Sequence, residues 1–179
     1  MNQEVKKYKV GQKAFKTQNL FSISAFIETK ASTSSKYPYC EDIIFLEFSE
    51  GKNSSGGFVY DTKNKISMMI NSDELRCLMY GCKELLKNGK SDYKNYSDPG
   101  LSSSTTNGSK KVLTLGFSQN TYFINIEMSN RKVSINFDKY KLLSFCDTLE
   151  NIANEAESLL FNYQRKLEAS INKQSQQQS

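Results

Sequence analysis

Basic residues, most of them beside tyrosine or phenylalanine, recur at five places in the sequence. Lysine ammonium groups pair with phosphates, and aromatic rings offer faces on which nucleobases of any sequence can stack. This recurrence favours a surface that binds single-stranded nucleic acid. The candidate binding residues are Lys9, Lys13, Phe15 and Lys16; Lys36, Tyr37 and Tyr39; Tyr60, Lys63 and Lys65; Lys110 and Lys111; and Tyr122, Arg131 and Lys132.

The basic N-terminal stretch KKYKVGQKAF, residues 6–15, precedes every apolar segment of the chain. A single lysine beside an aromatic residue is most often a solvated charge next to a core side chain. Recurrence in five places favours a shared surface instead. We therefore expect this stretch to form the first strand of the binding face, with Gly11 allowing a bend or a close approach.

Catalysis is the function class that the composition favours least. The sequence has no histidine, which removes the commonest general base and metal ligand, and it has no glycine-rich phosphate loop. Asp61 and Glu47 fit turn and surface charges better than catalytic acids. The cysteine spacing favours free, mostly buried thiols, so we expect no enzyme activity, metal or cofactor. The cysteines are Cys40, Cys77, Cys82 and Cys146.

The size and charge of the chain set broad limits. With 179 residues, 37% of them hydrophobic, it can form one buried domain or two small fused units. A net charge of +5 favours acidic partners, nucleic acid first. The sequence has no apolar run of membrane-spanning length, and the stretch MNQEVKKYKV lacks the apolar centre typical of a signal peptide. We expect no membrane association and a place in the cytoplasm or nucleoid, with an organelle matrix as an alternative.

The first half of the chain alternates polar and apolar residues and then changes period. Alternation predicts strands at residues 19–29 and 42–50, and a hairpin at 58–71 after the polar turn GKNSSGG. A helix follows, with Ser72 as its N-cap and Gly89 at its end. Its predicted buried stripe is Leu75, Leu78, Met79, Cys82, Leu85 and Leu86. These elements make a first repeat over residues 8–90.

The second half restarts the same plan after a predicted linker at residues 91–109. Three short strands are expected within residues 110–138, followed by a helix at about 139–166 and a disordered polar tail at 167–179. The expected helix stripe is Tyr140, Leu143, Cys146, Leu149, Ile152 and Ala153, continued by Leu159, Leu160 and Tyr163. The second repeat therefore spans residues 110–166.

The two halves match best where a strand leads into a helix. KISMMINSDELRCLMYGCKELL and RKVSINFDKYKLLSFCDTLENI each contain a lysine-led strand, a turn and an amphipathic helix. This tandem strand-strand-strand-helix repeat predicts an α+β fold with two antiparallel sheets, each followed by a helix that leaves one sheet face free.

The segment FVYDTKNKISMMINSDELRCLMYG resembles the Whirly family of single-stranded DNA-binding proteins. IIFLEFSEG is similar to that family's preceding strand, and KKVLTLGFSQNTYFINIEMSNRKVSINFDKYKLL resembles its second sheet and second helix. YKVGQKAF is similar to its lysine-glycine-lysine-alanine signature, with Val10 and Gln12 as departures. The resemblance covers residues 8–152 and implies one Whirly-like domain at 1–166.

The Whirly resemblance also implies a function. It implies a homo-oligomer, a tetramer or dimer built through the helices, that lays single-stranded DNA across its outward sheet faces. Such a protein coats or protects DNA exposed in replication, recombination or repair. Two alternatives stay open: an RNA-binding or annealing protein of the same fold, and an adaptor that assembles through helices and strand edges without nucleic acid.

Overall fold

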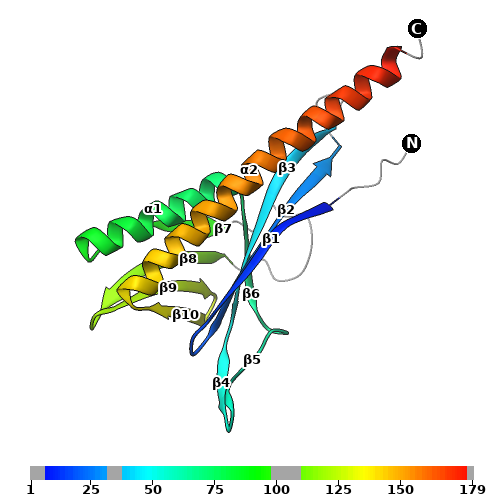
Figure 1. Cartoon of the computed structure of the whole chain (residues 1–179). Helices are drawn as coiled ribbons and strands as arrows, with labels where there is room; N and C mark the ends of the chain where they lie inside the picture. The colour runs from blue at the N-terminus through cyan, green and yellow to red at the C-terminus, as the bar shows by residue number, and fades with distance from the viewer. Residues whose placement is uncertain (1–6, 32–37, 98–109, 177–179) are drawn as a thin grey trace.

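A computed structural model describes residues 7–31, 38–97 and 110–176 of the chain (Figure 1). The candidate residues Lys36 and Tyr37 lie outside these ranges. The first sheet is antiparallel and contains β1 (Lys7–Lys16), β2 (Leu20–Lys30), β3 (Tyr39–Ser49) and β6 (Ile66–Ile70), in that order. Helix α1 (Ser72–Asn88) follows it. A separate hairpin joins β4 (Gly51–Ser54) to β5 (Gly57–Tyr60).

The second half of the chain also contains a four-stranded sheet followed by a helix. The second sheet is antiparallel and contains β7 (Lys94–Ser97), β8 (Lys111–Ser118), β9 (Thr121–Met128) and β10 (Arg131–Phe137). Helix α2 (Lys139–Gln176) follows it. The predicted α+β class, with antiparallel sheets and two helices, is confirmed. Both of these larger sheets have four strands, one more than the predicted strand-strand-strand-helix plan.

Three predicted boundaries are corrected by the strand pairing and the helix length. The predicted hairpin at 58–71 is wrong, because β5 pairs with β4 whereas β6 pairs with β3 and buries Ile66 and Met68. The predicted linker at 91–109 contains β7, which pairs with β8. The predicted disordered tail continues α2 as far as Gln176. Residues 160–176 lack proline and glycine and place Leu167 and Ile171 at helical spacing, which favours the helix.

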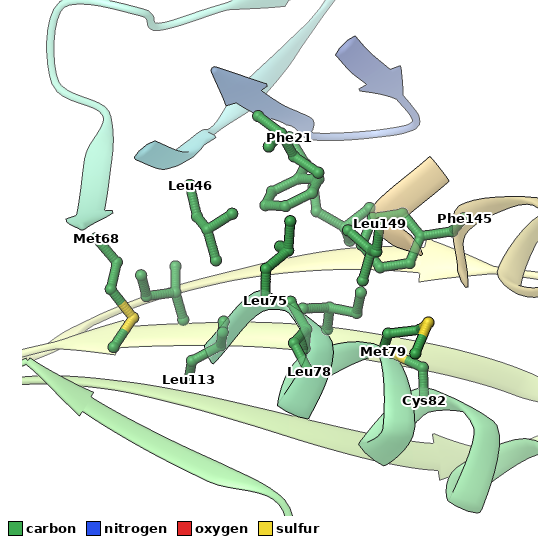
Figure 2. Packing of buried hydrophobic residues seen from close by; sticks show 14 of the residues in the cluster. Phe21, Leu46, Met68, Leu75, Leu78, Met79, Cys82, Leu113, Phe145 and Leu149 are labelled. Carbon is green, nitrogen blue, oxygen red and sulfur yellow. The ribbon is translucent and has the colours of Figure 1, made fainter. Parts of the chain in front are cut away.

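One hydrophobic core joins both sheets and both helices (Figure 2). Phe21, Leu46 and Met68 from the first sheet meet Leu113 from the second, and α1 and α2 pack between them. The buried residues of the helices include Leu75, Leu78, Met79, Cys82, Phe145, Cys146 and Leu149. The face of each sheet that contributes to this core is called its inner face below, and the opposite face its outer face.

The two helices lie antiparallel and are linked by charged side chains. Arg76 contacts Glu157 at 2.6 Å, and Lys83 contacts Glu150 at 3.5 Å. The predicted stripe of α1 is confirmed. On α2 the prediction was off at the start, because Tyr140 is 78% exposed and Leu143 41% exposed, whereas Leu142 and Phe145 are buried.

The N-terminus of α1 is capped by Asn71, one residue before the predicted cap. The Asn71 side chain accepts from the backbone N–H of Glu74, and the Glu74 side chain accepts from the backbone N–H of Asn71, which completes a capping box. The backbone N–H of Ser72 instead donates to the Asp42 carboxylate. Gly89 ends the helix in the left-handed region with φ 69°, as predicted.

Candidate nucleic-acid interface

Strand register decides which side chains lie on the outer faces. On β2, Phe21, Ile23, Ala25 and Ile27 are buried, so the alternate residues Ser22, Ser24 and Phe26 lie on the outer face. On β9, Tyr122, Ile124 and Ile126 are buried, so Phe123 and Asn125 lie on the outer face. The helices cover the inner faces (Figure 1). Any ligand that lies flat on a sheet therefore meets the outer set.

Two phenylalanines and a lysine occupy the centre of the first sheet's outer face. The Nζ atom of Lys7 lies 4.6 Å from the ring centroid of Phe26 and 4.8 Å from that of Phe45. The two rings are 6.0 Å apart in an edge-to-face arrangement. Met69 pairs with Phe45 across β3 and β6 and is 55% exposed. The face therefore offers rings and a thioether, with a cation above them.

Two further lysines stand on the same face along β1. The register pairs Lys9 with Phe26, and Lys16 with Leu20, so both side chains lie on the outer face. Both are exposed. Lys9 donates to the side-chain oxygen of Gln12 at 2.6 Å and has no carboxylate partner among the residues described here. These ammonium groups can reach phosphates of a strand that crosses the rings.

The acids of this face are already paired with lysines. Lys30 contacts both Glu28 and Glu41, and the hydrogen bond with Glu41 raises the pKa of Lys30. Glu47 contacts Lys65 and accepts from the hydroxyls of Ser22 and Ser67. The face thus carries five lysines (7, 9, 16, 30 and 65) against three glutamates (28, 41 and 47), a balance of +2. The carboxylate nearest the two rings is that of Glu47, two residues from Phe45 on the same side of β3, and Lys65 pairs with it.

The outer face of the second sheet has a similar pairing. The Nζ atom of Lys110 lies 4.6 Å from the ring centroid of Tyr96, and this ring is 50% exposed. Lys94 follows on β7 and is also exposed. Lys132 contacts Glu127 at 2.9 Å, which neutralises the one carboxylate on the described strands of this face. Cations and a ring again share one surface.

Several of the predicted binding residues lie on the outer faces of the sheets, as the nucleic-acid-binding hypothesis requires. The register or ion pairing places Lys9, Lys16, Tyr39, Lys65, Lys110 and Lys132 on the outer faces. Lys63 is exposed in the turn before β6. Lys13 is also exposed, but the register pairs it with the buried Ile23, so it stands at the sheet edge on the inner row.

Two predicted rings are corrected because they pack in the core. The Phe15 ring lies 4.9 Å from that of Phe145, edge to face, and Tyr122 is 9% exposed and packs against Phe117. The outward rings on the same two hairpins are Phe26 and Phe123, which the prediction did not include. Phe26 gave a signal in the sequence, because it shares its side of β2 with Ser22 and Ser24 rather than with the apolar residues.

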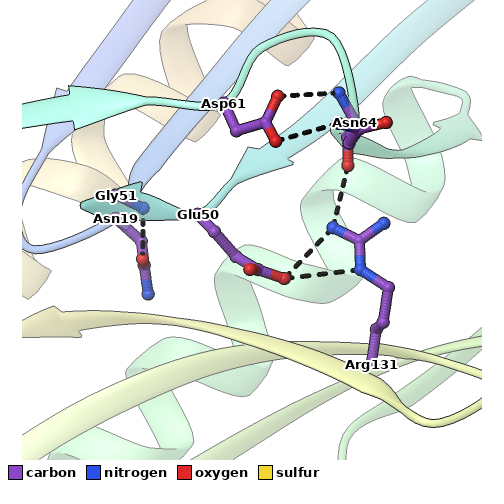
Figure 3. A network of polar contacts seen from close by, with 6 residues as sticks. All are labelled: Asn19, Glu50, Gly51, Asp61, Asn64 and Arg131. Carbon is purple, nitrogen blue, oxygen red and sulfur yellow. Dashed lines mark hydrogen bonds and ion pairs between the residues drawn. The ribbon is translucent and has the colours of Figure 1, made fainter.

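Three other predicted residues are used within the protein. Lys111 donates to the carbonyl oxygen of Ser67 at 2.7 Å and so joins the two sheets. Arg131 contacts Glu50 at 3.1 Å and donates to the carbonyl oxygen of Asn64 at 2.8 Å (Figure 3). The third is Tyr60, whose hydroxyl donates to the carbonyl oxygen of residue 17. Their polar groups therefore support the junction between the elements.

The same junction is closed by Asn19 in the turn between β1 and β2. Its Oδ1 accepts from the backbone N–H of Gly51 (Figure 3). Its Nδ2 donates to the carbonyl oxygen of Ser134 in the second sheet. A Cβ on Gly51 would lie 1.9 Å from the carbonyl oxygen of Gln18, so glycine is required there. These contacts fix the first sheet against the second and hold the two outer faces in one arrangement.

Comparison with known proteins gives no neighbour for this arrangement. No family model, curated protein or solved structure matches the chain. The Whirly resemblance therefore stays a prediction. Within the described part of the chain, no three potential ligating residues gather as a metal site, and neither helix is both long and apolar enough to cross a membrane.

Proposed function

We propose that this protein binds single-stranded DNA with little dependence on sequence, along the outer faces of its two sheets. In this role it coats or protects DNA exposed in replication, recombination or repair. The observation that carries the proposal is the direct pairing of cations with outer-face rings, Lys7 with the half-buried Phe26 and Phe45, and Lys110 with the exposed Tyr96. In each pair, the ring can stack on a base and the lysine can contact a phosphate of the same nucleotide strand.

The energetics favour exchange of a lysine for a base on these rings. A cation above an exposed ring contributes about 0.5–1 kcal/mol, whereas a base stacked on an aromatic side chain contributes about 1–3 kcal/mol. When the base takes the ring, the displaced ammonium group meets a phosphate of the same strand. The lysine therefore keeps an electrostatic partner while the ring gains a stronger one.

A single strand suits these faces better than a duplex. In a duplex the base faces are already stacked on one another, so the rings of Phe26, Phe45 and Tyr96 can reach only terminal bases. An unpaired strand offers every base to the sheet. Stacking also explains the expected tolerance of sequence, since every base has an aromatic face.

The fold and the assembly belong to the same proposal. A four-stranded antiparallel sheet followed by a helix, occurring twice, supports a Whirly-like tandem repeat. Exposed apolar side chains on the helices support a dimer or tetramer built through them. These side chains are Tyr80, Tyr140, Leu143 and Phe161. Sedimentation equilibrium tests the assembly, and a monomer at all concentrations would contradict it.

Fluorescence anisotropy with labelled oligonucleotides tests the proposed function. The same mixed sequence is presented as single-stranded DNA, duplex DNA and single-stranded RNA over a salt series. We expect tight, salt-sensitive binding to single-stranded DNA and much weaker binding to duplex. A preference for RNA would support the RNA-binding alternative. Equal weak binding to all three, lost at physiological salt, would leave the adaptor alternative.

A ring variant and its matched control locate the surface. Phe26→Leu with Phe45→Leu keeps apolar side chains on the outer face but removes the stacking surfaces. Phe58→Leu removes an exposed ring from the β4–β5 hairpin, which lies outside both four-stranded sheets. We expect the first variant to lose affinity for single-stranded DNA and the second to keep it. Equal effects would place binding elsewhere.

A further inference from the structure

Met69 places a thioether in solvent on the outer face of the first sheet. Its side chain is 55% exposed, whereas its neighbours on β6, Met68 and Ile70, are buried. The solvent side of an antiparallel sheet usually carries polar residues, so core packing does not explain a large apolar side chain at this position. Single exposed apolar residues are nevertheless common on proteins, and the neighbours of Met69 therefore matter.

Met69 belongs to an apolar patch rather than standing alone. Its direct partner across β3 and β6 is Phe45, whose ring lies 6.0 Å from that of Phe26, edge to face. The register pairs Phe26 with Ile43, which lies on the same face and is buried. The term outer apolar patch is used below for Phe26, Ile43, Phe45 and Met69. Met69 is its most exposed member.

The outer apolar patch ends at the strand that adjoins the second sheet. β6 is an edge strand of the first sheet, and Lys111 at the start of β8 donates to the carbonyl oxygen of Ser67 on β6 at 2.7 Å. A DNA strand that passes from the rings of the first sheet toward Tyr96 on the second therefore crosses β6. The outer-face side chains of β6 are Ser67 and Met69.

We propose that Met69 is a contact for the bound DNA strand and a site of oxidation, so that peroxide weakens binding by converting the thioether to a sulfoxide. This inference rests on the proposed function and adds a modification site to it. A polarisable thioether packs favourably against aromatic groups, and nucleobases are aromatic. A sulfoxide is polar and disrupts such contacts.

The oxidation is a two-electron transfer from sulfur to peroxide. A lone pair of the Met69 sulfur attacks one oxygen of hydrogen peroxide, so an S–O bond forms and the O–O bond breaks. The second oxygen leaves as water after proton transfer. The sulfur is oxidised, the peroxide is reduced, and methionine sulfoxide reductases can reverse the change. The reaction needs only access of peroxide to the sulfur.

Exposure makes Met69 the preferred target among the described methionines. Met68 and Met79 are each 1% exposed, and Met128 is half-buried and packs against the core. Met1 lies outside the described residues. Peroxide that meets the folded protein therefore reaches the Met69 thioether more easily than the other three.

Peroxide treatment followed by anisotropy titration tests the effect on binding. Oxidised wild type should bind oligo-dT about 2- to 10-fold more weakly, the range of a thioether–aromatic contact. The slope of log Kobs against log salt should stay the same, because oxidation changes no charge. Met69→Leu keeps an apolar side chain without sulfur, so it should bind like wild type and keep its affinity after treatment. Met128→Leu is the matched control and should stay sensitive to peroxide.

Protection by DNA tests the contact itself. Tandem mass spectrometry separates Met69 from the neighbouring Met68 and measures oxidation with and without saturating oligo-dT. We expect bound DNA to slow oxidation of Met69 and to leave that of Met128 unchanged. The exposed Cys77 also reacts with peroxide. Dithiothreitol reverses disulfides but not the sulfoxide, so affinity should return with methionine sulfoxide reductases and not with dithiothreitol.

The outcomes separate this inference from the proposed function. Equal oxidation of Met69 with and without DNA would overturn the contact. Full affinity of a protein oxidised at Met69, or an equal loss in treated Met69→Leu, would overturn the oxidation site. Each of these results leaves single-strand binding by the untreated protein in place. Absence of that binding before any treatment would instead overturn the proposed function.

Discussion

The salt dependence of binding tests the proposed interface quantitatively. Five outer-face lysines have no ion-pair partner among the described residues, whereas Lys30, Lys65 and Lys132 are paired with glutamates. If each of the five meets one phosphate, the slope of log Kobs against log salt is about −3.5, at about 0.7 per contact on a single strand. The five are Lys7, Lys9, Lys16, Lys94 and Lys110.

Removing two of these charges should change that slope by a calculable amount. Lys9→Gln with Lys16→Gln removes two contacts, so the slope should fall to about −2.1. The ring variant Phe26→Leu with Phe45→Leu removes no phosphate contact and should keep the original slope. Its affinity should instead fall about 5- to 150-fold for each base that loses its stacking partner, at every salt concentration.

The assay is an anisotropy titration of single-stranded DNA between about 50 and about 200 mM salt, over which wild-type affinity should drop about 130-fold. Circular dichroism confirms that the variants are folded. The reasoning is refuted if the lysine variant keeps the wild-type slope, because its charges then face solvent rather than phosphate. It is equally refuted if the ring variant changes the slope, since rings contribute no counterion release.

Three further predictions concern stability. Gly81→Ala should lower the free energy of unfolding by up to about 2 kcal/mol in urea melts. The added methyl group is overpacked against Tyr93, which costs about 1–3 kcal/mol, whereas the better helix propensity of alanine recovers about 1 kcal/mol. An unchanged unfolding midpoint would contradict this prediction. Arg131→Gln leaves Glu50 unpaired and should cost about 1 kcal/mol without altering the salt slope of DNA binding; an altered slope would return Arg131 to the interface. The pKa of Asp138 lies below its ordinary 3.8 because the N–H of Lys141 donates to it, so its stabilisation is present above that pH and lost as pH falls through the folded pKa. Asp138→Asn should therefore flatten acid unfolding, and an unchanged acid limb argues against this role.

The secondary structure was largely predictable because it depends on local patterns. Alternation on β2 and the helical spacing of Leu75, Leu78 and Met79 each identify an element without knowledge of the rest. Strand pairing was not predictable in the same way. β5 and β6 are adjacent in sequence, yet β6 pairs with β3 because its apolar side chains extend the core, and β5 stays outside with Phe58 exposed.

For the candidate site, the sequence predicted the types of residue better than the face of the sheet on which each residue lies. A basic residue beside a ring in sequence points to the opposite face of a strand, so Phe15 and Tyr122 enter the core while their neighbours face outward. A β-bulge in β1 is a second reason why the sequence does not predict which face a lysine occupies. The β1–β2 register breaks between Lys9 and Gly11, so Lys9 pairs with the outer Phe26 whereas Lys13, four residues later, pairs with the inner Ile23. Simple alternation places both lysines on one face.

The structure also separates outward-facing lysines from basic residues that join parts of the protein, which the net charge of +5 cannot do. Lys111 contacts Ser67 and Arg131 contacts Glu50, so both add to the net charge while their polar groups are used within the protein. These links nevertheless matter for the proposed function, because they fix two outer faces that carry the remaining lysines and rings. A DNA strand bound to one outer face has a high effective concentration near the other face only while the junction keeps the two faces in a fixed arrangement. The junction is therefore expected to affect affinity for long oligonucleotides more than for short ones that occupy one sheet.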